Sequence, residues 1–252
     1  MSKEKRTAHL EESARAAFCG ISVIIPARNE ERHLPRLLRA LRAMPEIGEI
    51  IVGDGGSSDQ TIAISQKMKA RVVEGARGRG AQQNAGASAA SGEILWFLHA
   101  DSLPDSQCGR QIVRATRRGA IGGNFRLHFE ARGFWPRGFE AIARFQRVFG
   151  VYYGDSGFFV RREVWQELEG FRAWPLFEDF DFARRLETLA RRDNRKTACC
   201  AGRLRVSARR FQQRPGRVLL LWLALQIGFK LGVSPHHLAR FYAGSTKNEA
   251  ER

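Results

Sequence analysis

A histidine and an aspartate two positions apart are the first residues whose placement suggests chemistry. His99 and Asp101 follow the five apolar residues 94–98, a run typical of a strand covered on both faces of a sheet. A carboxylate just beyond such a strand can bind Mg²⁺ or Mn²⁺ together with the phosphate oxygens of a ligand. An imidazole can bind Mn²⁺ as well, or hydrogen-bond a ribose or a phosphate.

Three acidic residues stand close together in the later motif FEDFD. Glu178, Asp179 and Asp181 precede the helically spaced Phe182 and Leu186, which predicts a helix that begins at the acidic group. The positive end of a helix dipole favours ionised carboxylates, and a general base must be ionised to take a proton from a hydroxyl. Ordinary capping would explain one of these acids alone, and the pattern does not choose among the three.

Polar residues also stand at three earlier junctions between a predicted strand and a predicted helix. The segment 26–31, PARNEE, is expected to start a helix with Asn29 as its cap, and a helix N-terminus suits a phosphate or a nucleobase edge. Asp54 precedes two glycines and could accept hydrogen bonds from a base or a ribose. The later segment GARGRGAQQNAG lacks the GxGxxG spacing, so Arg79 and Asn84 are expected to be ligand contacts outside a dinucleotide loop. A plain turn or cap would explain each junction taken alone.

The elements that must position these residues alternate between strand and helix. Apolar runs predict strands at 21–26, 49–52, 71–74 and 94–98. Helical spacing predicts helices between them, at 34–41, 61–68 and 80–90. Such alternation implies right-handed crossovers and a mostly parallel sheet, whose ligands bind beyond the carboxyl ends of the strands.

The charge of the chain favours anionic partners. Lys and Arg number 42 against 26 Asp and Glu among 252 residues, a net charge of +16. Nucleic acid, acidic lipid headgroups and phosphorylated small molecules would all suit this charge, although scattered arginines can also reflect a genomic composition bias. No clustered basic stripe or recognisable module points to a specific nucleic-acid partner.

The cysteines and the N-terminus bear on location. The four cysteines, at positions 19, 108, 199 and 200, form no CxxC pair, which is typical of reduced cytosolic thiols. Residues 1–19 lack the apolar core of a signal peptide and are expected to form a flexible leader. We therefore expect a cytoplasmic protein.

Four motifs together carry a family resemblance. They are ISVIIPARNEERHL, EIIVGDGGSSDQT, GRGAQQNAGASAASGEILWFLHADSLP and FEDFDFARRL, in this order. Over roughly 21–211 the chain resembles the inverting family 2 glycosyltransferases. The resemblance implies an α/β, GT-A type nucleotide-binding fold with a mostly parallel central sheet flanked by helices, and a C-terminal helical segment. It also implies transfer of a sugar from a nucleoside-diphosphate sugar to an acceptor hydroxyl with inversion, assisted by Mg²⁺ or Mn²⁺.

The resemblance also assigns roles to residues. Asp101 corresponds to the last aspartate of the family's metal-binding DxD motif, in which His99 replaces the first, and Asp179 corresponds to the catalytic base. Arg210 belongs to a segment that loosely resembles the family's (Q/R)xxRW motif, where an arginine would neutralise the leaving diphosphate. The residues implied to line the nucleoside pocket are Pro26, Ala27, Asn29, Glu30 and Asp54.

The predicted organisation has three parts. They are a leader at 1–19, a glycosyltransferase domain at 20–215 with a nucleotide-binding half (20–102) and an acceptor half (103–215), and an apolar, basic helical tail at 216–252. The tail holds an apolar run at 218–233, shorter than the about 20 residues that span a membrane. This run is either a core or dimer-interface helix, or an interfacial helix on an anionic membrane. The second reading would place the protein peripherally at the inner membrane face and would suit a lipid or lipid-linked acceptor.

The sequence lacks the motifs expected of two other enzyme classes. A nucleotidyltransferase would carry a lysine-bearing, glycine-rich loop after the first strand, and PARNEERHL has no lysine. A serine hydrolase would carry a GxSxG elbow, which the sequence lacks. A basic nucleic-acid-binding protein stays the non-enzymatic alternative.

Overall fold

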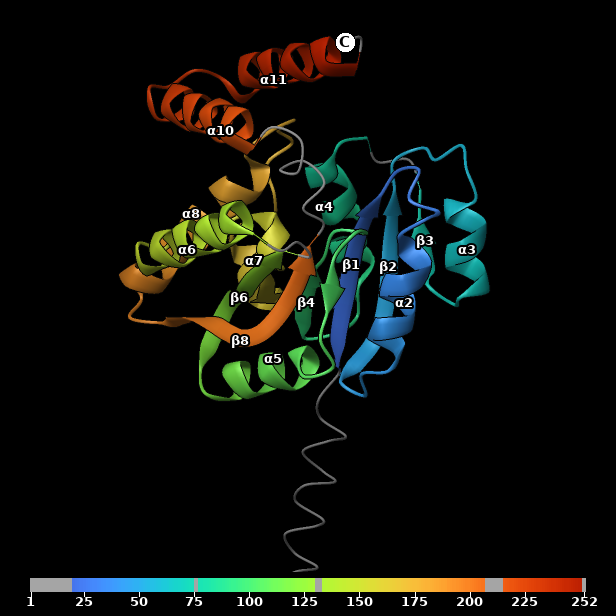
Figure 1. The fold of residues 1–252 in the computed structure, drawn as a ribbon. Coiled ribbons are helices and arrows are strands. Elements are labelled where there is room, and N and C mark those ends of the chain that lie inside the picture. The colour runs from blue at the N-terminus through green and yellow to red at the C-terminus, as the bar shows by residue number, and fades with distance from the viewer. Residues whose placement is uncertain (1–19, 75–76, 130–132, 207–214, 251–252) are drawn as a thin grey trace, which may run out of the picture.

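The computed structural model describes residues 20–74, 77–129, 133–206 and 215–250. These residues form a central sheet with helices packed on its two faces (Figure 1). The predicted leader at 1–19 and Arg210 lie outside the described residues.

The sheet has a parallel half and a mixed half. The first strands are β1 (Ile21–Ala27), β2 (Ile47–Asp54), β3 (Arg71–Val73) and β4 (Ile94–Phe97), and all of their pairings with one another are parallel. The later strands are β5 (Leu103–Pro104), β6 (Ala120–Phe129), β7 (Phe159–Arg161) and β8 (Lys196–Val206). Strand β7 is antiparallel to β4 and β6, whereas β6 and β8 are parallel. The order across the sheet is β3-β2-β1-β4-β7-β6-β8-β5.

Helices connect and cover these strands. They are α2 (Leu34–Arg42), α3 (Thr61–Lys67), α4 (Arg79–Ala89), α5 (Cys108–Arg117), α6 (Phe134–Val148), α7 (Arg162–Glu167), α8 (Glu178–Arg192), α10 (Pro215–Lys230) and α11 (Pro235–Ala250), with a short 3₁₀ turn at Gly154–Ser156. The predicted α/β class is confirmed. The four predicted strands and three predicted helices of the first hundred residues are all present, with ends displaced by a few residues.

Two apolar layers hold the sheet between its helices. Successive residues of β1 point to opposite faces: Val23 packs in a cluster with Leu34 of α2, and Ile24 packs in a cluster with Phe182 of α8. All of β1 is buried, which explains why every residue of it except Ser22 is apolar. Each such fully buried aliphatic or aromatic side chain contributes about 1.5–3 kcal/mol, so the ends of these strands provide rigid attachment points for the loops that follow them.

The predicted helix cap at Asn29 is wrong. Helix α2 begins at Leu34, is preceded by His33 and carries a proline in its first turn, where the fixed φ of proline favours helix initiation. Asn29 instead adopts a left-handed conformation with φ 57°, which asparagine tolerates better than most residues. Residues 28–33 therefore form a loop between β1 and α2.

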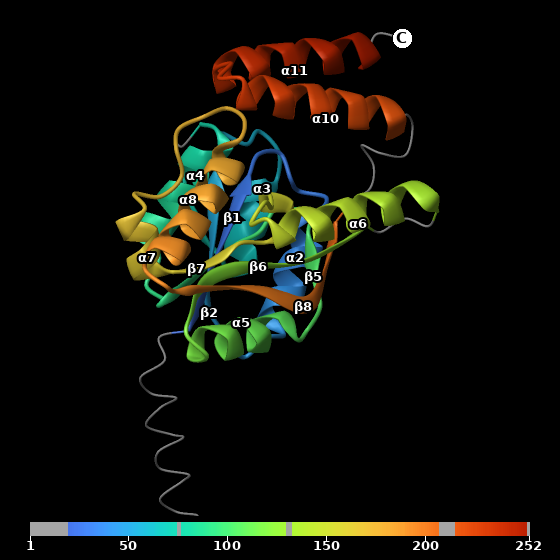
Figure 2. The same cartoon turned by 90° about the vertical axis from the view of Figure 1, so that its left-hand side faces the viewer.

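The C-terminal segment forms a helical hairpin, α10 and α11, that lies at the end of the molecule toward which β1 and β2 point (Figures 1 and 2). Phe229 of α10 packs on Phe177 and Phe180 at the start of α8, with ring centroids 4.8 and 5.7 Å apart. In the part of the chain that is described, no helix combines the length and apolar character needed to cross a membrane.

Candidate active site

The candidate site lies beyond the carboxyl ends of the parallel strands, where loops follow β1, β2 and β4. The first two loops are tied together. Asn29 donates its backbone N–H to Ser57 Oγ (3.0 Å) and accepts from the Ser58 N–H at its side-chain oxygen (2.9 Å). Asp54 is buried, and its carboxylate accepts from the Gly56 N–H (2.8 Å), the Ser57 N–H (2.9 Å) and the Ser57 hydroxyl (2.5 Å). Asn29 and Asp54 thus organise the two loops, and Asp54 has little carboxylate surface left for a ligand.

The other residues predicted for the nucleoside pocket lie in the same place. Pro26 and Ala27 are buried at the end of β1, and the Ala27 carbonyl accepts a hydrogen bond from the Gln82 side chain (2.8 Å). Glu30 is half-buried and pairs with His33 (3.0 Å). Their backbone groups and the Glu30 carboxylate are therefore at the rim, while the side chains of Pro26 and Ala27 belong to the core.

Arg79 and Glu178 form a buried link between α4 and α8. The Arg79 Nε–H donates to Glu178 Oε1 at 2.5 Å, with the Glu178 side chain 1% exposed and that of Arg79 38% exposed. Burial raises the pKa of Glu178 and the charge of Asp179 raises it further, whereas Arg79 lowers it. The other oxygen of Glu178 is buried and has no hydrogen-bond partner among the described residues.

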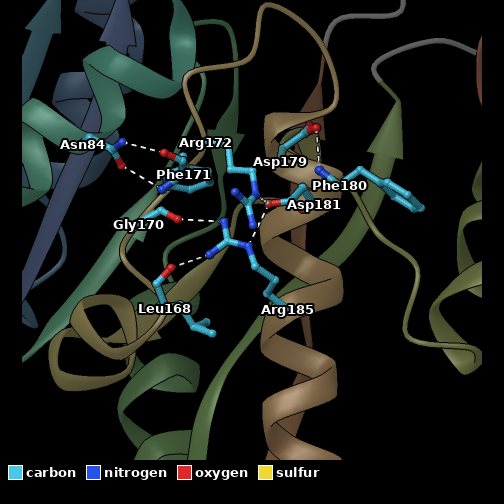
Figure 3. Close-up of polar contacts among 9 residues, drawn as sticks. All are labelled: Asn84, Leu168, Gly170, Phe171, Arg172, Asp179, Phe180, Asp181 and Arg185. Atoms are coloured by element: carbon cyan, nitrogen blue, oxygen red, sulfur yellow. Dashed lines mark hydrogen bonds and ion pairs between the residues drawn. The ribbon is translucent and has the colours of Figure 1, made fainter. Parts of the chain in front are cut away.

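Asp179 has a different environment from its acidic neighbours. Its Oδ2 accepts the Gly154 N–H and its Oδ1 accepts the Phe180 N–H, each at 2.7 Å (Figure 3 shows the second bond). A Cβ atom added to Gly154 would lie 3.1 Å from both Asp179 Oδ2 and His99 Nε2. The fold therefore brings His99, from the loop after β4, and Asp179, from the start of α8, to the same glycine.

Asp181 is committed to ion pairs. Its carboxylate contacts Arg185 at 2.7 Å and Arg172 at 3.3 Å, and Arg185 also donates to the Gly170 carbonyl at 2.7 Å and to the Leu168 carbonyl (Figure 3). These bonds fix the loop that precedes α8. Of the three acids that the sequence left open, only Asp179 is described without an arginine partner.

Asn84 has a role other than the predicted donor contact. Its amide donates to the Phe171 carbonyl (2.7 Å) and accepts from the Phe171 N–H (2.9 Å), as Figure 3 shows. Gly170, at φ 65°, has space for no Cβ, because one would lie 2.6 Å from the Asn84 oxygen. Both ends of the amide are therefore occupied in holding the 170–172 loop against α4.

Asp101 is the exposed acid of the site. It lies in the loop between β4 and β5, and within the described ranges no group of three or more histidines, cysteines, aspartates or glutamates could hold a metal ion. Mg²⁺ and Mn²⁺ commonly bind through one or two carboxylates plus phosphate oxygens. The donor set of Asp101 and His99 thus fits an ion shared with a bound diphosphate and does not fit a protein-enclosed metal.

Sequence reasoning missed the segment 152–156, between β6 and β7. Burial, together with the charges of Asp179 and Asp101, raises the pKa of Asp155 to about 6, although Arg79 acts in the opposite direction. Burial also raises the pKa of Tyr153, with added effects of Asp179 and Asp155. The run YYGDSG, an acid between two glycines after two aromatic residues, was the available signal.

Comparison with known proteins identifies the family of this chain. The family model described as "Glycosyl transferase family 2" matches residues 22–173, more than half of the chain. The chain belongs to glycosyl transferase family 2. The predicted family resemblance is thereby confirmed.

Curated relatives of this family 2 chain match over part of their length. A 4,4'-diaponeurosporenoate glycosyltransferase of Staphylococcus haemolyticus is 40% identical over 89 residues, which is 32% of this chain and 24% of the relative. An undecaprenyl-phosphate 4-deoxy-4-formamido-L-arabinose transferase of Pseudomonas fluorescens is 30% identical over 156 residues, 56% of this chain and 46% of the relative. The chain thus spans between a quarter and about half of the length of these relatives.

Solved structures confirm the GT-A fold of this family 2 chain. TarS of S. aureus matches with a TM-score of 0.61 at 18% identity, over 75% of this chain and 60% of that one. Glucosyl-3-phosphoglycerate synthase of Mycobacterium tuberculosis matches with a TM-score of 0.53 at 22% identity, over 77% of this chain and 73% of that one.

Proposed function

We propose that this chain is an inverting glycosyltransferase that moves a sugar from a nucleoside diphosphate to an acceptor hydroxyl, with Asp179 as the base. The proposal rests above all on the environment of Asp179. Its carboxylate accepts hydrogen bonds from two backbone amides, next to His99 and at the carboxyl edge of the sheet. Its two acidic neighbours are held by arginines instead.

The chemistry follows from this placement. Each oxygen of Asp179 accepts one backbone hydrogen bond, so the carboxylate is oriented and still has lone pairs for a proton. Asp179 takes the proton of the acceptor hydroxyl while that oxygen attacks the anomeric carbon from the face opposite the diphosphate, which inverts the configuration. General bases of this kind contribute about 10²–10⁴-fold in rate.

The donor is proposed to bind across the loops after β1, β2 and β4. The backbone around Ala27, Asn29 and Glu30 would contact the nucleoside. Arg79 uses one N–H on Glu178 and is 38% exposed, so its remaining N–H groups are available to the diphosphate. Structures of TarS with UDP-GlcNAc and of glucosyl-3-phosphoglycerate synthase with Mn²⁺ and UDP support a nucleoside-diphosphate donor.

A divalent ion, Mg²⁺ or Mn²⁺, is proposed to accompany the donor. Asp101 would hold it, with His99 as a second ligand. When bound, such an ion neutralises the charge that develops on a leaving diphosphate. The exposed carboxylate of Asp101 supports this role.

The acceptor is proposed to be a lipid or a lipid-linked sugar, reached at an anionic membrane surface. The names of two relatives, with undecaprenyl phosphate and diaponeurosporenoate, favour such acceptors. On α10 and the turn after it, Leu220, Ile227 and Leu231 are 67%, 57% and 79% exposed. Residues 215–243 contain basic but no acidic residues, and basic amphipathic surfaces favour anionic bilayers. A cytoplasmic protein bound peripherally to the inner membrane face would fit these features.

The catalytic proposal is tested with Asp179→Asn and Asp101→Asn. We expect Asp179→Asn to bind UDP as the wild type does but to lose about 10²–10⁴-fold in turnover. Asp101→Asn should lose the Mn²⁺-dependent part of UDP binding measured by calorimetry. Asp193→Asn, at the exposed end of α8, is the matched control. Normal turnover of Asp179→Asn would refute its role as the base.

The membrane proposal is tested by co-sedimentation with phosphatidylglycerol vesicles at low and high salt. We expect salt-sensitive binding that is absent with phosphatidylcholine. The double variant Arg217→Glu, Lys230→Glu should bind less, and Arg192→Glu on the exposed end of α8 should bind normally. Protein that stays in the supernatant with both lipids at both salt concentrations would refute membrane binding.

A further inference from the structure

A cavity of ≈ 110 Å³ lies between β6, α6 and α10, outside the donor loops. Figure 2 shows α10 above α6, with β6 beneath. Most of the cavity wall is apolar and is formed by residues of β6, α6 and α10. The apolar side chains include Leu127, Phe129, Phe139, Ile142, Leu219 and Trp222.

One end of this cavity is formed by the segment that donates a hydrogen bond to the proposed base. Tyr153, Asp155 and Ser156 line it, and Gly154 between them donates to Asp179 at 2.7 Å. Trp222 of α10 packs edge-on against Tyr153, with centroids 5.6 Å apart. The wall of the cavity and the support of the base are therefore one piece of chain.

An unsatisfied polar atom marks this end of the cavity. The Tyr153 hydroxyl is buried and has no hydrogen-bond partner among the described residues. A buried hydroxyl without a partner costs about 1–3 kcal/mol, and a ligand in the cavity that hydrogen-bonds to Tyr153 would offset this cost.

The helices that line the cavity also carry exposed apolar side chains. Ile142 and Phe145 of α6 are 38% and 66% exposed, and Leu220 and Leu223 of α10 are 67% and 42% exposed. Exposed apolar side chains on the helices beside a cavity are typical of interaction sites. A chain longer than the cavity could therefore continue between α6 and α10.

We infer that this cavity binds the apolar part of an amphiphilic acceptor, with the hydroxyl-bearing end at Tyr153 and directed toward Asp179. The inference rests on the proposed function and adds to it the place and chemistry of the acceptor. Its volume is of the order of the about 150 Å³ cavity that takes up benzene, so it holds only the first few carbons of the apolar part. The rest lies along the faces of α6 and α10.

The test uses 1-octanol as the probe, titrated calorimetrically into the full chain. Ala143 lines the cavity, whereas Ala141 on the same helix is exposed and does not. We expect Ala143→Phe to fill the cavity and weaken octanol binding by about tenfold or more, a change of about 1.4 kcal/mol or more, with Ala141→Phe binding as the wild type does. Equal octanol affinity in the three proteins, or none in the wild type, would overturn the inference.

A second measurement on the wild type does not depend on a variant that folds. Cys199 lines the cavity and is exposed, whereas Cys108 and Cys200 are buried. Saturating octanol should slow the alkylation of Cys199 by N-ethylmaleimide, followed by peptide mass spectrometry, and ethylene glycol should not. An unchanged rate with octanol would overturn the inference.

The two proposals fail in different ways. If UDP with Mn²⁺ binds but octanol does not, the apolar acceptor site is wrong and the donor site stands. If octanol binds in the cavity but no nucleoside diphosphate binds, the cavity is an apolar site and the glycosyltransferase proposal fails.

Discussion

Asp155 should make the folded protein less stable as the pH rises from about 4 to about 6. Burial and the charge of Asp179 together raise its pKa from 3.8 to about 6. The folded state then holds this proton more tightly than the unfolded state. The free energy of unfolding is therefore highest below the unfolded pKa and falls as the pH rises through the folded one. A pKa difference of about 2 corresponds to about 3 kcal/mol once the group is fully ionised.

The substitution Asp155→Asn removes this titration and keeps the size of the side chain. In urea unfolding, the variant should gain about 2–3 kcal/mol relative to the wild type between about pH 4 and about pH 8. Asp193→Asn is the control, because the pKa of Asp193 is shifted in the opposite direction. Its hydrogen bond and ion pair with Arg192 lower the pKa of Asp193, so the stability it contributes is lost only as the pH falls below about 4. The difference between Asp193→Asn and the wild type should therefore be nearly the same at about pH 4 and about pH 8. A difference between Asp155→Asn and the wild type that is the same at both pH values would refute the reasoning.

Two further predictions concern the contacts that hold α4 against the start of α8. Arg79→Met leaves the buried Glu178 without its 2.5 Å partner and should cost about 2–3 kcal/mol in urea unfolding. The loss of stability should be larger at about pH 8 than at about pH 5, because protonation of Glu178 removes the unpaired buried charge. A loss of stability that is the same at both pH values would contradict this prediction. Asn84→Ala removes two hydrogen bonds to Phe171 and should cost about 1–3 kcal/mol with unchanged UDP affinity. An Asn84→Ala variant that is as stable as the wild type but binds UDP more weakly would show instead that Asn84 contacts the donor.

The nucleotide-binding half could be predicted from the sequence because its strands are buried on both faces. β1 is apolar except for Ser22 and is buried throughout, so its short sequence is enough to identify it as a strand. The leucines of α2 are all buried at helical spacing. Local periodicity also places His99 and Asp101 correctly, since they directly follow β4.

Residue roles within the site could not be predicted in the same way, because they depend on contacts between distant segments. Asn84 meets Phe171 across 87 positions, and no local pattern shows that both ends of its amide are occupied. Asp54 illustrates a second limit. It ends strand β2, at the edge of the sheet where a ligand residue would lie, but the turn formed by its own neighbours uses its carboxylate.

The three acids at the start of α8 show how the fold gives different roles to residues that share a motif. Glu178 is paired with Arg79, which lies 99 positions earlier, and Asp181 with Arg185 one turn later. A carboxylate in such a pair could take up a proton only by leaving its arginine without a counter-charge. Asp179 instead has backbone amides as its hydrogen-bond partners and no ion pair with an arginine among the described residues. The motif therefore supplies the acids, and the different partners of the three acids support the proposal that the middle one is the base.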